Sequence, residues 1–156
     1  MAADYQMTVL GVGNPIMADD GIGLALLAAV QAARPDDRIE YVDGGTGGME
    51  LIPVVQDANR LLILDAVAGK QPGQVVELTG DQVPRMLSAK LSPHQVGLLD
   101  VFTAARLLGR EPSLVKVVGV TPQIVDLSIE LSPVVQDALD EATAKACAII
   151  DQWLAD

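Results

Sequence analysis

The segment that most constrains the fold lies at residues 60–67, which read RLLILDAV. The apolar side chains from Leu61 to Leu64 precede Asp65, and no polar residue alternates with them. An unbroken apolar run of strand length is typical of a strand covered on both faces, as in a parallel sheet between helices. The sequence therefore predicts an α/β fold, and its aromatic content of only 3% predicts an aliphatic core.

Strand-like and helix-like segments alternate along the rest of the chain. Strands are predicted at 7–13, 38–42, 60–67, 73–78 and 113–120. Helices are predicted at 20–33, 49–58, 81–87 and 95–108, and a last helix begins with Ser132 as N-cap and Pro133 in its first turn. This alternation predicts a three-layer α/β/α sandwich. We expect one domain over residues 1–156, because the chain has the length of a single domain.

Composition argues against several classes of function. The formal net charge of −11 repels phosphate backbones and anionic membrane surfaces, so we expect neither nucleic-acid nor membrane binding. The first residues lack a basic segment followed by an apolar one, so we expect a cytoplasmic protein without a targeting segment. Cys147 is the only cysteine, which excludes an internal disulfide and multi-cysteine metal sites. We expect it to be a buried thiol of the last helix.

A glycine-containing loop, GVGNPIMADDGIG at 11–23, includes the end of the first predicted strand. It fails the dinucleotide-binding fingerprint G-x-G-x-x-G because Ile16 stands at the last glycine position. Asp19 and Asp20 would also repel a pyrophosphate. We expect Asp19 to cap the following helix. Asp20 is either a second cap or a cation ligand, since the glycines beside it leave room for a ligand or another loop.

Candidate metal ligands occur in segments that are far apart in the sequence. Asp20 follows the first strand, Asp65 ends the 60–67 strand, and His94, the only histidine, lies in LSPHQVGLLDV at 91–101. In an open α/β sheet, residues past the carboxyl ends of neighbouring strands converge in one crevice. Two carboxylates and an imidazole suit Ni²⁺ or Zn²⁺. Taken singly, Asp65 could instead anchor a loop by hydrogen bonds, and His94 could tie one.

The string DGGTGG at 43–48 follows the second predicted strand. Its glycines expose backbone N–H groups and leave room for an extended peptide, although a flexible turn is the alternative. We expect substrate to bind at the residues that follow Asp43, which are Gly44, Gly45, Thr46 and Gly47. Asp43 is a candidate general base, substrate-binding group or turn residue. Neither G-x-S-x-G nor H-E-x-x-H occurs, which argues against a serine hydrolase and a thermolysin-like metalloprotease.

Together, the segments 11–23, 41–51, 61–67 and 91–101 resemble the hydrogenase maturation endopeptidases. The resemblance runs from about Met7 to Pro133 in matching order and spacing. It implies a five-stranded, mostly parallel twisted sheet in which 73–78 is the antiparallel strand. It also implies functional roles at four positions: metal contact by Asp20, Asp65 and His94, and an important glycine-loop aspartate at Asp43.

The activity that this resemblance implies is a single endoproteolytic cut. The enzyme would remove the C-terminal extension of a nickel-iron hydrogenase large-subunit precursor after nickel insertion. The substrate would supply the nickel, and no organic cofactor is expected. Two mechanisms remain open: the nickel aligns the peptide as a recognition element, or it activates the carbonyl or a water while Asp43 or a freed carboxylate takes protons. A non-enzymatic nickel-binding maturation chaperone is the alternative.

Overall fold

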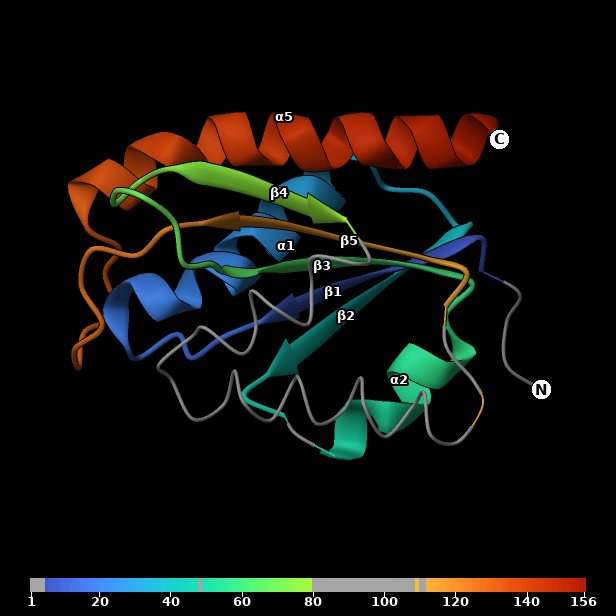
Figure 1. Cartoon of the computed structure of the whole chain (residues 1–156), viewed down its shortest axis with the longest axis horizontal. Coiled ribbons are helices and arrows are strands. Elements are labelled where there is room, and N and C mark those ends of the chain that lie inside the picture. The colour runs from blue at the N-terminus through green and yellow to red at the C-terminus, as the bar shows by residue number, and fades with distance from the viewer. Residues whose placement is uncertain (1–4, 48, 80–108, 110–111) are drawn as a thin grey trace.

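The computed structural model describes residues 5–47, 49–79, 109 and 112–156. Its strands form one sheet with the order β2-β1-β3-β5-β4 (Figure 1). They are β1 (Met7–Val12), β2 (Ile39–Gly45), β3 (Arg60–Ala66), β4 (Val75–Thr79) and β5 (Leu114–Val120). Four strands run parallel and β4 pairs antiparallel with β5. The predicted α/β fold is confirmed, including the five-stranded, mostly parallel sheet with its antiparallel strand in the 73–78 region.

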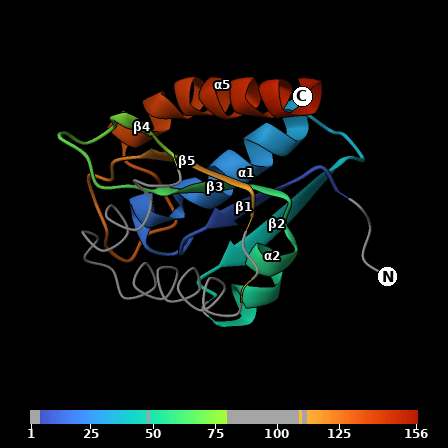
Figure 2. The same cartoon turned by 45° about the vertical axis from the view of Figure 1, so that its right-hand side comes forward.

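Helices cover both faces of the sheet. α1 (Ile22–Ala33) and α5 (Pro133–Ala155) pack together on one face. α2 (Ile52–Asp57) lies on the other (Figures 1 and 2). Two short 3₁₀ turns precede helices, η1 (Ala18–Gly21) before α1 and η2 (Met49–Leu51) before α2. Within the described residues, the molecule therefore has the helix, sheet and helix layers that the alternating pattern predicts.

The central strand β3 is buried on both sides. Its residues Leu61 to Leu64 are each 0% exposed. Leu62 and Leu64 pack in the cluster with α1 and α5, whereas Leu61 and Ile63 pack in the cluster with α2. Side chains alternate between the faces of a strand, so this unbroken apolar run supplies both cores. The interpretation of residues 60–67 is confirmed.

α1 approaches the sheet closely where Gly11 and Gly23 face each other. A Cβ added to Gly11 would lie 2.9 Å from the Gly23 backbone oxygen. A Cβ added to Gly23 would collide with the backbone oxygens of Val12 and Leu64. Only glycine fits at such a close approach of two backbones. This contact fixes the start of α1 over the carboxyl ends of β1 and β3.

Several boundaries differ from the sequence predictions. β2 continues to Gly45, whereas the sequence indicated an end at 42. Segment 49–58 divides into η2 and the short α2, and the helix predicted from Asp20 begins as the η1 turn. The predicted helices at 81–87 and 95–108 lie outside the described residues.

The C-terminal helix α5 follows its predicted apolar stripe. Val135, Ala142, Ala146, Ile149 and Trp153 are buried, and Leu139 packs half-buried against the same cluster. Cys147 is a buried free thiol, as expected. In the described part of the chain, no helix is both long and apolar enough to cross a membrane.

Candidate functional site

The chain reverses its direction of winding between β1 and β3. From β1 it passes to β2 on one side, and from there it crosses to β3 on the other side of β1. In open α/β sheets, ligands bind in the crevice outside the carboxyl ends of strands at such a switch point. The β1 and β3 ends are therefore the expected place for a functional site.

Asp20 lies in the loop that leaves β1 at this point. It belongs to η1 and is 2% exposed. Its Oδ2 accepts a hydrogen bond from the backbone N–H of Asn14 at 3.0 Å. Gly13 stands beside it with φ +140°, and a Cβ on Gly13 would collide with the Asp20 backbone oxygen. The loop thus folds back tightly on β1 and holds the Asp20 carboxylate close to the end of that strand.

Asp65 lies at the end of the adjacent strand β3. It is 1% exposed, and its Oδ1 accepts a hydrogen bond from the Ala66 N–H at 2.7 Å. η1 packs against β3, and a Cβ on Gly23 would lie 3.0 Å from the Asp65 Cα. The structure therefore brings the segments that carry Asp20 and Asp65 together at the switch point. Carboxylate oxygens are ligands for divalent cations, so these two side chains at one crevice of the sheet are a candidate ligand set.

The third predicted ligand, His94, lies outside the described residues. Within those residues, no group of three or more His, Cys, Asp or Glu side chains is arranged to hold a metal ion. Asp20 and Asp65 therefore form the part of the predicted ligand set that the structure places. The complete set of Asp20, Asp65 and His94 stays a prediction.

Asp19 has a different role from the predicted helix cap. The N-cap positions of η1 and α1 are Met17 and Gly21, and neither cap makes a side-chain hydrogen bond. Instead, the Asp19 carboxylate is 0% exposed and accepts hydrogen bonds from groups more than a hundred residues away in sequence. The donors are Gln123 N–H (2.9 Å), Ile124 N–H (2.8 Å), Ser132 N–H (2.7 Å) and the Ser132 hydroxyl (2.7 Å).

These hydrogen bonds determine the ionisation of Asp19 and the role of the Ser132 hydroxyl. Burial acts to raise the pKa of Asp19, but the hydrogen bonds from Ile124, Ser132 and Gln123 outweigh it and hold the pKa below its ordinary value. Ser132 occupies the N-cap position of α5, as predicted, but its hydroxyl donates to Asp19 and does not cap the helix. Asp19 is therefore an ionised anchor between two distant loops.

The anchored loop, residues 122–131, is a feature that the sequence patterns did not indicate. The Ala18 N–H donates to the Ser128 carbonyl, and the Ser128 N–H donates to the Ile16 carbonyl. This pairing holds Ala18 at φ +51°, a conformation that is strained for a residue with a side chain. Leu127 and Ile129 are 80% and 85% exposed, and Ile16 is half exposed beside them. Exposed apolar residues held next to a site are typical of a surface that contacts protein.

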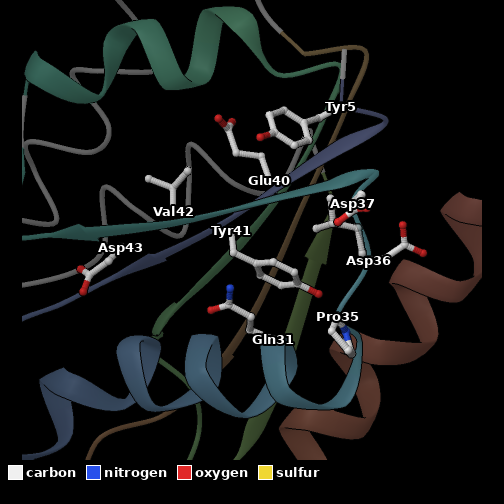
Figure 3. A pocket seen from close by; sticks show the side chains of 10 residues that line it. Tyr5, Gln31, Pro35, Asp36, Asp37, Glu40, Tyr41, Val42 and Asp43 are labelled. Atoms are coloured by element: carbon white, nitrogen blue, oxygen red, sulfur yellow. The ribbon is translucent and has the colours of Figure 1, made fainter. Parts of the chain in front are cut away.

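Asp43 and the glycine loop lie at the end of β2. The Asp43 Oδ1 accepts a hydrogen bond from the Gly45 N–H at 2.9 Å, and Gly45 has φ +50°. The Asp43 side chain is exposed and lies on the same face of the sheet as Tyr41 and α1 (Figure 3). By strand alternation, Asp65 lies on the opposite face, with Leu61 and Ile63. Asp43 therefore shapes its own turn and is separated from Asp65 by the sheet.

Comparison with known proteins identifies the family. A family model described as hydrogenase maturation protease matches residues 6–149. The chain is 36% identical to hydrogenase 2 maturation protease of Escherichia coli K12, over 93% of this chain and 90% of that protein. It is also 36% identical to the hydrogenase expression/formation protein HupD of Bradyrhizobium diazoefficiens, over 96% of this chain and 80% of that protein.

Solved structures agree with this result. The hydrogenase maturating endopeptidase HybD of Escherichia coli superposes with a TM-score of 0.86 at 35% identity, covering 93% of this chain and 91% of that chain. The chain therefore belongs to the hydrogenase maturation protease family. Its activity is that of an endopeptidase in hydrogenase maturation, and the resemblance seen in the sequence motifs is confirmed.

Proposed function

We propose that this endopeptidase removes the C-terminal extension of a nickel-iron hydrogenase large-subunit precursor after nickel has been inserted. The observation that carries the proposal is the pair of buried carboxylates, Asp20 and Asp65, whose segments meet at the switch point of the sheet. The exposed apolar side chains on loop 122–131 support a protein substrate, because they lie beside the β1 loop and form a surface suited to a protein partner.

For the nickel, we propose recognition by Asp20 and Asp65 together with His94. Carboxylate oxygens and an imidazole are ligands that Ni²⁺ accepts. The cation belongs to the substrate, so an incomplete protein shell leaves positions for the precursor's own ligands. A precursor without nickel would lack the group that aligns its extension on the enzyme.

The position of Asp43 supports the recognition mechanism over cation-assisted proton transfer. A base that takes a proton from cation-bound water must lie within hydrogen-bond reach of that water. Asp43 and Asp65 lie on opposite faces of the sheet, and Asp43 is already bonded to Gly45. We propose that Asp43 makes its catalytic contact with the substrate peptide, against Gly44, Gly45, Thr46 and Gly47.

The test is cleavage of purified large-subunit precursor with and without nickel, followed by intact-mass spectrometry. The proposal expects loss of the extension from the nickel-loaded precursor and an unchanged mass for the nickel-free one. Cleavage of both forms at the same rate would contradict nickel recognition. Tight binding of the loaded precursor without any change in mass would favour the nickel-binding chaperone instead.

A further inference from the structure

The outer edge of β2 is open within the described part of the structure. β2 is the terminal strand of the sheet and pairs only with β1 among the described strands. Edge strands present backbone N–H and C=O groups that can pair with an added strand. A protease whose substrate is an extended tail can use such an edge, because an incoming peptide completes the ladder.

The hydrogen-bond pattern shows which residues of β2 face this edge. The Gln6 N–H donates to the Arg38 carbonyl at 2.8 Å, so Arg38 faces β1. In a parallel ladder, consecutive residues direct their backbone groups to opposite sides. Glu40 and Val42 therefore face β1, whereas Ile39, Tyr41 and Asp43 face outward. The Ile39 N–H confirms this direction, since it donates away from β1 to the Asp36 carbonyl at 3.1 Å.

A groove of about 710 Å³ runs along this edge and ends at Asp43 (Figure 3). Four carboxylates line it, those of Asp36, Asp37, Glu40 and Asp43, and none of its described lining residues is Lys or Arg. Asp36 is paired with Arg38 at 2.7 Å, so the other three carry most of the negative charge. The groove thus fits an extended peptide that bears basic side chains.

The groove also leads to the candidate site. Asp43 of β2 pairs with Gly11 of β1, and Gly11 pairs in turn with Leu64 of β3, the residue before Asp65. A strand added outside β2 would lie about three strand spacings, or roughly 15 Å, from β3. About four or five extended residues span that distance. A nickel-bearing segment near Asp20 and Asp65 and a tail in the groove can therefore belong to one peptide.

We propose that the C-terminal extension of the precursor binds as an added strand on the outer edge of β2, pairing with the backbone of Tyr41 and Asp43. This inference rests on the proposed function, because it takes the precursor as the substrate. Basic side chains of the extension lie over the carboxylates of Asp37 and Glu40. The edge holds the released segment, while the β1 and β3 ends hold the nickel-bearing segment.

The first test is residue-resolved amide exchange by NMR on the wild-type protein, with a synthetic peptide that has the sequence of the extension. Binding should slow exchange at the outward amides of Tyr41 and Asp43. The inward amides of Glu40 and Val42, which already bond to β1, are the internal controls and should change little. Absence of binding at millimolar peptide, or protection confined to other elements, would overturn the inference.

The second test compares Tyr41→Pro with Tyr41→Ala in cleavage of the nickel-loaded precursor. Both variants lose the phenol, which donates to the Arg34 carbonyl at 2.6 Å, but only the proline variant also loses the outward N–H. Losing this one hydrogen bond predicts a KM about threefold to tenfold higher for the proline variant than for the alanine variant, with kcat nearly unchanged. If circular dichroism shows that the proline variant does not fold, the amide-exchange experiment alone tests the added-strand inference.

Charge provides a matched comparison. Asp37→Lys should raise KM about threefold, whereas Asp137→Lys, an exposed change on α5 away from the groove, should not. Failure of the wild type to cleave the loaded precursor would contradict the proposed function itself. Normal cleavage by the wild type, with equal KM values for the two Tyr41 variants, would contradict only the added-strand inference.

Discussion

The loops after β1 and β2 leave the same end of the sheet but hold their carboxylates in opposite ways. In the β1 loop, Asp19 is fully buried and accepts hydrogen bonds from residues 104 to 113 positions away. At the end of β2, Asp43 is exposed and accepts a hydrogen bond from Gly45, only two positions away. The Asp19 carboxylate therefore makes tertiary contacts, whereas the Asp43 carboxylate holds only its own turn.

This difference matches two separate requirements of the proposed reaction. Selecting a cation requires ligands held in nearly constant geometry, because misplacement of a coordinating atom weakens binding. Binding an extended tail requires accessible backbone and adaptable side chains. The β1 loop, which carries Asp20, has the first property, and the β2 edge has the second. Changing residues in each loop should therefore affect different measurable quantities.

The largest expected effect comes from removing charge beside the switch point. Asp20→Asn and Asp65→Asn should each lower kcat/KM for the nickel-loaded precursor about 1,000-fold, since loss of a direct ligand exceeds the effect of losing a supporting group. His94→Ala should have a comparable effect. The measurement is single-turnover cleavage followed by mass spectrometry, with circular dichroism to verify the fold. A folded variant that cleaves at nearly the wild-type rate would remove that residue from the ligand set.

The next effect is on stability and concerns the buried anchor. Asp19→Ala should lower the free energy of unfolding by about 3 kcal/mol, because the two buried donors of Ser132 and the part-buried N–H groups of residues 123 and 124 lose their acceptor. Urea denaturation measures this change. Asp43→Ala is the matched control and should cost less than about 1 kcal/mol, since its carboxylate is exposed. Equal losses for the two variants would refute the contrast between the loops.

The sequence predicted the fold well because its main signals are local. The apolar run at 61–64 and the spacing of buried residues in α5 depend on neighbours within a few positions, so they could be read directly. The end of β2 was harder to predict from the sequence. Asp43, Gly44 and Gly45 read as a turn, but pairing with β1, with a register shift at Gly11 and Val12, extends the strand to Gly45.

The candidate site could be predicted only in part, because some of its contacts depend on residues that are distant in the sequence. Asp20 and Asp65 could be proposed as ligands because they lie at or just past strand ends, which converge by topology, and the structure brings their segments together. Asp19 was misread because a carboxylate before a helix favours capping, and its true partners lie on a loop whose position depends on the whole fold. Loop 122–131 carries no motif, and its role emerges only from its pairing with Ile16 and Ala18.

A third, smaller effect separates charge from turn formation at Asp43. Asparagine keeps an oxygen that can accept the Gly45 N–H but lacks the negative charge. If the charge acts on the substrate, Asp43→Asn should lower kcat about 100-fold while stability stays near that of the wild type. Asp43→Ala, the comparison variant, should lose the same activity and also the turn. Normal cleavage by Asp43→Asn would show that the residue only shapes the loop.

The smallest effect is a pH dependence of stability that follows from the lowered pKa of Asp19. Its pKa in the folded protein lies below the ordinary value, so its contribution to stability is complete above the ordinary carboxyl pKa of about 4. As the pH falls through the lower folded-state pKa, the carboxylate takes up a proton and that contribution is lost. In urea denaturation from pH 7 to pH 2.5, the stability difference between wild type and Asp19→Asn should stay constant above about pH 5 and narrow in acid. A stability difference that persists unchanged at pH 2.5 would mean that the anchor does not depend on the charge of Asp19.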